Sequence, residues 1–247
     1  MSQLLDQIQY AIKNTVLDNS VGVAFSGGVD STLIAKLLHD DGYDIHLLTI
    51  GFHESHDINF AKQVNEILKF KHDILEIEPE SFQETSEKIH DIIKTDNLSW
   101  NENSIAFHYV SKLAKSLGIS TVVTANGIDE LFCGYNAYRE AISVSVEEVM
   151  NVMNKKLDNE MKMMIAVNNV TSSFGVKILQ PLLNENFISY AKTIPISEKI
   201  TDPDDLQRKH AIRKLAVSCG VPEISAYKQK KALQYGSKIH KQLLKLR

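Results

Sequence analysis

The chain has 247 residues, 43% of them hydrophobic and 23% charged, and a formal net charge of −4. This composition is typical of a globular protein with a packed core, and the length allows one large domain or two small ones. The negative charge argues against a nucleic-acid partner, and no apolar run reaches the roughly 20 residues that cross a membrane. Cys133 and Cys219 form no CxxC or zinc pattern, and no signal peptide is evident, so we expect a cytoplasmic protein.

The first 140 residues alternate between helical and strand-like patterns. The strand-like segments are short, apolar and β-branched, and they cover 21–25, 44–50, 72–77 and 119–124. The helical patterns cover 1–16, 32–39, 60–68 and 105–117. This alternation predicts an α/β fold, a Rossmann-like parallel sheet of about five strands with helices on both faces.

The strand pattern fades after about residue 140. Residues 141–169 predict one or two helices, and prolines then separate shorter helical segments. No repeat or flexible linker divides the chain. We therefore expect a single domain over 1–247, with an α/β nucleotide-binding core in 1–140 and a mainly helical part in 141–247 that completes the site.

The segment "VGVAFSGGVDSTLIAKLLHD" places a glycine turn between a strand and a helix. Gly27 and Gly28 allow a tight turn and a close approach of the backbone to a ligand. The helix that follows presents free N–H groups and a partial positive charge. Ser26, Ser31 and Thr32 add hydroxyl donors, so the loop predicts a phosphate site, although it lacks the GxxxxGK[ST] pattern of a Walker loop.

Asp30 lies within this anion-binding turn, where a carboxylate alone would repel a phosphate. A Mg²⁺ ion between the carboxylate and phosphate oxygens removes the conflict, because Mg²⁺ favours one or two carboxylates plus substrate phosphates. The alternative is that Asp30 only caps the helix and that the glycines form an ordinary turn.

Four segments in sequence order resemble the ATP-pyrophosphatase family and, within it, the C-terminal synthetase domain of asparagine synthetases. They are "SGGVDS" (26–31), "ANGIDELFCGYNAY" (125–138), "LQPLLNENFISYAKTIP" (179–195) and a final segment (209–237) that contains "KHAIRKL" and "YKQKK". The resemblance covers nearly the whole chain. It implies an adenine nucleotide alpha-hydrolase-like fold and ATP cleavage between the α and β phosphates.

The resemblance also assigns roles to residues of the loop and of the second segment. It implies that the loop residues hold pyrophosphate and that Asp30 and Asp129 are the two carboxylates that bind Mg²⁺. The loop residues are Ser26, Gly27, Gly28, Asp30, Ser31 and Thr32. Because Asp129 follows the strand 119–124, we expect it to reach the same sheet edge as Asp30. The alternative for Asp129 is a helix cap.

The remaining implied residues bind adenine and stabilise the charge that develops on the phosphates. Ile50, at the end of the second strand, and Ala125 match the nucleotide pocket. Lys230 matches the catalytic lysine of the final segment, and Lys228 occupies the position of the family's arginine. The alternative is a solvated basic tail, since 225–247 holds seven Lys or Arg and no Asp or Glu.

The sequence departs from the family at the site where the second substrate reacts. Asn126 stands where ammonia-using members commonly have a glutamate base, and an amide cannot accept a proton. Leu179 and Asn184 replace an Arg and an Asp of the third segment. Either another group takes the proton or the nitrogen donor differs.

The expected function is an ATP-dependent amide-forming ligase that uses ATP and Mg²⁺. A carboxylate, aspartate or a related acid, is adenylated, and ammonia or an amine then displaces AMP. No room for a glutaminase domain precedes residue 21, so we expect no glutaminase activity and a nitrogen donor that is free ammonia, an amine, or ammonia from a separate glutaminase subunit. The alternatives are a catalytically altered nucleotide-binding regulatory protein and a tRNA-modifying ATP pyrophosphatase. A homodimer is one option for the oligomeric state.

Overall fold

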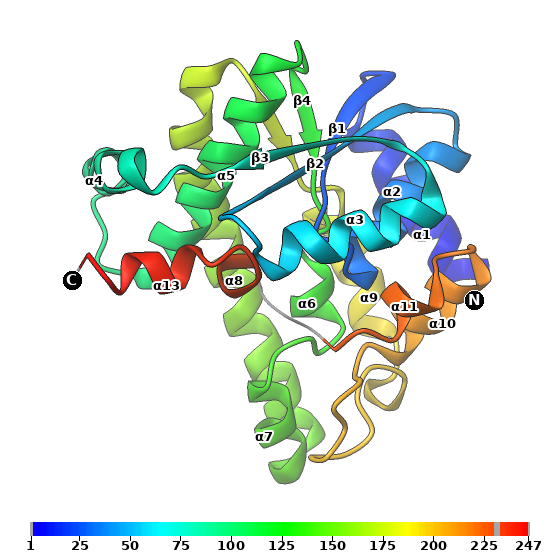
Figure 1. Ribbon diagram of the computed structural model, residues 1–247. Coiled ribbons are helices and arrows are strands. Elements are labelled where there is room, and N and C mark those ends of the chain that lie inside the picture. Colours follow the sequence, from blue (N-terminus) through cyan, green and yellow to red (C-terminus); the bar gives the residue numbers. More distant parts are fainter. Residues whose placement is uncertain (1, 230–232, 247) are drawn as a thin grey trace.

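The computed structural model describes residues 2–229 and 233–246, and its centre is a five-stranded sheet (Figure 1). The strands are β1 (Ser20–Ala24), β2 (Asp44–Gly51), β3 (Lys71–Glu76), β4 (Thr121–Val123) and β5 (Lys177–Leu179). Their order is β3-β2-β1-β4-β5, and all neighbours pair in parallel. The predicted α/β fold with about five parallel strands is therefore confirmed.

Successive residues of the central strands enter opposite cores, because side chains alternate between the two faces of a strand. Leu47 belongs to one core and Leu48 to the other, and the same holds for Val123 and Val122. Strands buried on both faces have continuous apolar segments. This explains why these strands could be recognised from the sequence.

Helices cover both faces of the sheet. One core includes residues from α1 (Ser2–Thr15), α2 (Val29–Asp40), α3 (His56–Leu68), α9 (Glu185–Thr193) and α10 (His210–Ser218). The other includes residues from α4 (Pro79–Ile93), α5 (Leu98–Ser116) and α13 (Ile239–Leu243). The long helix α8 (Val146–Thr171) contributes to both cores.

The part of the chain beyond residue 140 forms mostly helices, and it also supplies the edge strand β5. Residues 141–169 belong to two helices, α7 (Ala137–Val144) and α8, apart from Ser145, which lies between them. Helix α7 lies at the far end of the molecule from the sheet (Figure 1). The short elements are α6 (Ile128–Leu131), η1 (Ser172–Phe174), η2 (Pro181–Leu183), η3 (Ile196–Glu198), α11 (Glu223–Ala226) and α12 (Leu233–Gly236).

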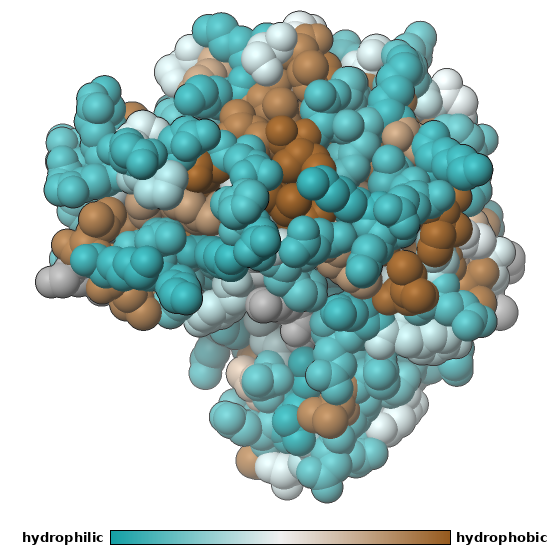
Figure 2. All heavy atoms as spheres, in the orientation of Figure 1, coloured by the Kyte–Doolittle hydropathy of each residue, from teal (hydrophilic) through white to brown (hydrophobic). Residues whose placement is uncertain are grey.

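Helix α4 has no counterpart among the sequence-predicted elements. Only Phe82, Ser86 and Ile89 of its 15 residues are buried, so its apolar stripe is too narrow to predict a helix clearly. The face drawn in Figure 2 is mostly hydrophilic, with apolar side chains in separate clusters. Within the described ranges, no helix is long and apolar enough to cross a membrane.

Candidate active site

The sheet order places a crevice between the carboxyl ends of β1 and β4. These two strands are neighbours, but the chain continues from β1 to β2 on one side and from β4 to β5 on the other. Parallel α/β sheets bind ligands at such a switch point. A cavity of about 270 Å³ lies there, lined by Ser26 and Gly28 after β1 and by Ala125 and Asn126 after β4.

The loop after β1 is held by the close fit of Gly27 and by the Ser31 hydroxyl. Gly27 has a φ of +75°, and a Cβ there would lie 3.1 Å from the Phe60 ring. The Ser31 hydroxyl donates to the Gly28 carbonyl oxygen (3.2 Å) and accepts from the Ser26 N–H (3.3 Å). Gly28 is the N-cap of α2, so the first turn of this helix faces the cavity.

Thr32 lies behind the loop and does not line the cavity with Ser26, Gly28 and Ser31. It is fully buried, and its hydroxyl lies 3.0 Å from that of Ser225, which also donates to the Gly27 carbonyl oxygen (2.7 Å). Thr32 thus connects the loop to α11, and its side chain is not placed to contact a phosphate in the cavity.

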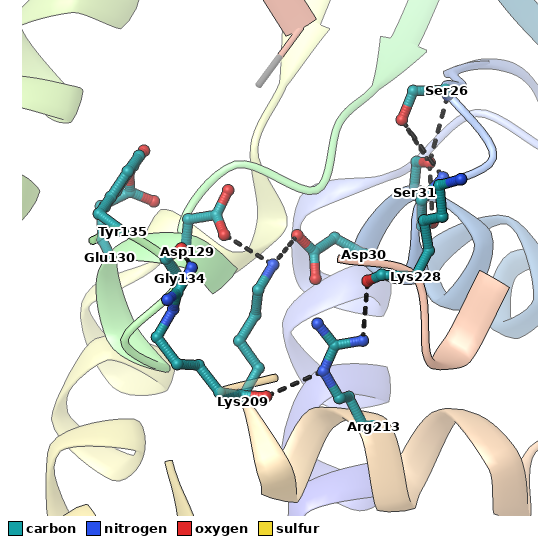
Figure 3. Close-up of polar contacts among 12 residues, drawn as sticks. Ser26, Asp30, Ser31, Asp129, Glu130, Gly134, Tyr135, Lys209, Arg213 and Lys228 are labelled. Atoms are coloured by element: carbon teal, nitrogen blue, oxygen red, sulfur yellow. Dashed lines mark hydrogen bonds and ion pairs between the residues drawn. The ribbon is translucent and has the colours of Figure 1, made fainter. Parts of the chain in front are cut away.

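Asp30 and Asp129 meet across the cavity, and the Lys209 ammonium lies between them (Figure 3). Lys209 Nζ is 2.6 Å from Asp30 Oδ2 and 2.6 Å from Asp129 Oδ1. The side chain of Lys209 is 2% exposed. The pKa of Lys209 is lowered, because burial outweighs the opposite effect of the Asp30 carboxylate. We call these three residues the Lys209 cluster.

Hydrogen bonds from two arginine side chains to backbone carbonyl oxygens fix the turn that carries Lys209. Lys209 precedes α10 in the left-handed conformation, with a φ of 54°, which is costly for a residue other than glycine. Arg213 Nε donates to the Arg208 carbonyl oxygen (2.9 Å), and Arg208 Nη2 donates to the Gly134 carbonyl oxygen (3.2 Å). Arg213 Nη1 also donates to the Lys228 carbonyl oxygen (3.1 Å), so α10 is connected to the part of the chain that carries Lys228 (Figure 3).

The predicted nucleotide residues Ile50, Ala125 and Lys228 all line this cavity. Ile50 is buried at the end of β2. Lys228 Nζ lies 4.6 Å from the centroid of the Phe60 ring, which is within cation–π range. Lys230 lies outside the described residues, so its predicted catalytic role stays a prediction.

Asn126 contacts one buried carboxylate, that of Glu160, and a second buried carboxylate, that of Glu130, lines the same cavity. Its Nδ2 donates to Glu160 Oε1 on α8 at 2.5 Å. Glu130, on α6, accepts from the Gly127 N–H (3.1 Å) and from the Tyr135 hydroxyl. Burial, followed by the charge of Glu160, raises the pKa of Glu130 to about 7, and burial also raises the pKa of Glu160. We call Asn126, Glu130, Tyr135 and Glu160 the Glu160 cluster.

The structure thus brings the predicted Ser26, Gly28, Asp30, Ser31, Asn126 and Asp129 to one cavity. Lys209 is the first residue of a family-like segment, and the sequence pattern indicates no role for it. Glu160 lies in a helical pattern with many other polar residues, so the sequence does not distinguish it from them. The pairing of these two with residues far away in the sequence is a product of the fold.

Comparison with known proteins agrees with the fold and identifies the family. The solved structure of NMN synthetase from Francisella tularensis is similar with a TM-score of 0.50 and 16% identity, over 95% of this chain and 75% of that one. A family model described as asparagine synthase matches residues 3–161. The chain therefore belongs to the asparagine synthase family.

Two relatives show how much of a longer protein this chain resembles. A Methanocaldococcus jannaschii protein provisionally named asparagine synthetase (glutamine-hydrolyzing) 1 is 28% identical over 98% of this chain and 51% of its own length. Asparagine synthetase (glutamine-hydrolyzing) 1 of Arabidopsis thaliana is 28% identical over 78% of this chain and 35% of its own length. The chain thus matches about half of the first relative and about a third of the second.

Proposed function

We propose that this protein is an ATP-dependent ligase that adenylates a carboxylate, releases pyrophosphate, and transfers ammonia or an amine to form an amide and AMP. The observation that carries this proposal is the meeting of Asp30, Asp129 and Lys209 beside the Ser26–Ser31 turn, in one cavity at the switch point of the sheet. Membership of the asparagine synthase family supports it. Aspartate or a related acid is the proposed carboxylate.

The loop after β1 is suited to bind the pyrophosphate part of ATP. The first turn of α2 offers N–H groups at the cavity, and the Ser26 and Ser31 side chains lie beside them. Gly27 keeps the backbone close to Phe60, and Thr32 supports the loop from behind. Ile50 and Ala125 supply apolar surface for the adenine.

Asp30 and Asp129 are suited to hold Mg²⁺ together with phosphate oxygens. Asp30 Oδ1 is buried and accepts no hydrogen bond from the described residues, so an acceptor remains for a cation. Two carboxylates from different strand ends fit the few-carboxylate preference of Mg²⁺. Bound there, Mg²⁺ would neutralise charge on the phosphates.

Positive side chains of the protein would stabilise the charge that builds up during adenylation. Oxygen of the substrate carboxylate attacks the α-phosphorus, and the bond to the β-phosphate oxygen breaks. Lys209 and Lys228 line the cavity where this charge develops, and Lys230 follows on the same segment as Lys228. Such fixed donors are typically worth about 10²–10³ in rate.

The proposal is tested by exchange of labelled pyrophosphate into ATP, with Mg²⁺ and a panel of carboxylic acids. Exchange that depends on one acid, aspartate first among those tried, is the expected result. ATP binding without exchange for any acid would instead support the nucleotide-binding regulatory alternative and contradict the ligase.

Lys230→Ala is expected to lower the exchange rate by about 10²–10³ while the affinity for ATP changes only a few-fold. The reason is that the ammonium is proposed to act on charge that develops after binding. The exchange rate at saturating ATP is compared with the ATP dissociation constant. An exchange rate equal to that of the parent protein would exclude the role proposed for Lys230.

A further inference from the structure

The Asn126–Glu160 contact joins the turn after β4 to the long helix α8. Asn126 Nδ2 donates to Glu160 Oε1 at 2.5 Å, and both residues line the same cavity as Asp129 and the Ser26–Ser31 turn. Glu160 is 5% exposed as a residue. A buried carboxylate therefore lies beside the residue that replaces the glutamate of ammonia-using family members.

This carboxylate has a donor but no positive partner among the residues that the structure describes. Among the described residues, the amide of Asn126 is the one group that stabilises its charge, and burial acts against that charge. The nearby ammonium of Lys156 instead lies over the Tyr135 ring, 4.9 Å from its centroid. A buried carboxylate without a cation is unfavourable, so it takes up a proton or a positive ligand.

Glu130 is less suited to meet a ligand than Glu160. Its Oε2 accepts from the Gly127 N–H, and its Oε1 accepts from the Tyr135 hydroxyl. Both oxygens thus have protein donors, whereas the described donors to Glu160 come from Asn126 alone. Within the Glu160 cluster, Glu160 is the carboxylate that remains able to accept from a ligand.

We propose that Glu160 binds the incoming nitrogen nucleophile as an ammonium group, ammonium itself or a primary amine, and takes its proton. The inference rests on the proposed ligase function and names the residue and the substrate class of its second step. Asn126 is then a positioning residue that holds Glu160. Glu160 performs the proton transfer that an amide at position 126 cannot perform.

The step is balanced as follows. The ammonium group gives one proton to Glu160, and the freed nitrogen lone pair attacks the carbonyl carbon of the acyl-adenylate. A C–N bond forms and the C–O bond to AMP breaks, with its electron pair remaining on the AMP oxygen. The surplus proton on the nitrogen passes to the departing AMP phosphate. Glu160 returns its own proton to solvent before the next turnover.

The first test compares Glu160→Gln with Glu147→Gln, a control on the exposed start of the same helix. With ATP, Mg²⁺, aspartate and ammonium chloride, Glu160→Gln should lower amide formation about 10²–10⁴-fold more than it lowers pyrophosphate exchange. Hydroxylamine is already neutral near pH 8, so hydroxamate formation should fall far less than amide formation. Equal losses of exchange, amide and hydroxamate would overturn the inference.

A second variant separates proton transfer from a structural role of the contact. Asn126→Asp combined with Glu160→Gln keeps the side-chain lengths and reverses the hydrogen bond, so a carboxylate again lies at the contact. This double variant should recover at least about tenfold of the amide-forming rate that Glu160→Gln loses. A rate no higher than that of Glu160→Gln would count against a base at this position.

A binding measurement decides the inference even if no acid supports exchange, which would defeat the ligase proposal separately. Thermal unfolding is followed in ammonium chloride and in tetramethylammonium chloride, which has no N–H group, at equal ionic strength. Ammonium should raise the unfolding temperature of the parent protein and of Glu147→Gln, but not that of Glu160→Gln. The same rise in all three proteins would contradict ammonium binding by Glu160.

Discussion

The Lys209 cluster and the Glu160 cluster line the same cavity, but their carboxylates differ in burial and in the charge of their partners. In the Lys209 cluster, one buried ammonium lies 2.6 Å from a carboxylate oxygen of both Asp30 and Asp129. In the Glu160 cluster, the donors to two buried carboxylates from the described part of the chain are all neutral, and the pKa of each carboxyl group is raised. One site carries a cation of its own, and the other is suited to receive one.

This difference in charge matches the ligand that each cluster is proposed to bind. A polyanion such as ATP needs positive charge, and Lys209 provides part of it while holding the two aspartates in place. An ammonium substrate needs negative charge, which an internal lysine would cancel. We therefore expect that removal of the positive charge of Lys209 destabilises the protein, whereas removal of the negative charge of Glu160 stabilises it as the pH rises.

The largest effect is expected for Asp129→Asn, with a loss of exchange activity of about 10³-fold, because a proposed Mg²⁺ ligand is removed. The free energy of unfolding should change little, since Lys209 keeps Asp30 as its partner. Exchange assays and urea unfolding measure the two quantities. Exchange at the rate of the parent protein would contradict the proposed role of Asp129 as a Mg²⁺ ligand.

Lys209→Met should lower the free energy of unfolding by up to about 3–5 kcal/mol, because it leaves two partly buried carboxylates, 20% and 17% exposed, without their cation. Addition of Mg²⁺ without nucleotide should then stabilise the variant more than it stabilises the parent protein. Lys214→Met, on the exposed side of α10, is the matched control and should be nearly neutral. A variant as stable as the parent would show that Lys209 does not balance the aspartates.

Gly27→Ala tests whether the loop depends on close packing as well as on charge. A Cβ at Gly27 would lie 3.1 Å from Phe60 atoms, whereas a Cβ at Gly42 would contact nothing within 4 Å. Both glycines have positive φ, so alanine should cost about 1–2 kcal/mol at each. Crowding should add about 1–3 kcal/mol at Gly27 only. Equal losses in urea unfolding would exclude a packing role.

The smallest effect is the pH dependence of stability that Glu160 introduces. The pKa of Glu160 is raised in the folded protein above its ordinary value near 4.5. The protonated side chain therefore contributes to stability below pH 4.5, and this contribution is lost as the pH rises through the raised pKa. Glu160→Gln should therefore gain stability relative to the parent as the pH rises, by at most about 1.4 kcal/mol per pH unit. Unfolding measured from pH 4 to pH 8 gives this difference. A difference that does not vary with pH would contradict the unfavourable burial of this carboxylate.

The sheet could be predicted from the sequence because its strands are buried on both faces. Segments 21–25 and 44–50 correspond to β1 and β2 within one residue at each end. The edge strand β5 has three residues, too few for a pattern, and α4 buries only a narrow stripe. The secondary structure of β5 and α4 is therefore determined by packing against neighbouring elements rather than by local sequence.

The site could be predicted only where its residues lie in one short segment. The turn from Ser26 to Ser31 and the segment around Asp129 have local patterns, and the structure brings them together. Lys209 reaches Asp30 over 179 residues, and Asn126 reaches Glu160 over 34. No local spacing indicates such contacts, so the partner of Asn126 became visible only in the folded chain.

The central claim, formation of an acyl-adenylate in this cavity, is tested most directly by transfer of oxygen. The carboxylic acid that supports exchange is labelled with ¹⁸O in its carboxylate and turned over with ATP, Mg²⁺ and ammonium. The proposed reaction transfers one ¹⁸O atom from the acid to each AMP, which mass spectrometry detects. AMP without label, or ADP and phosphate as the products, would contradict it.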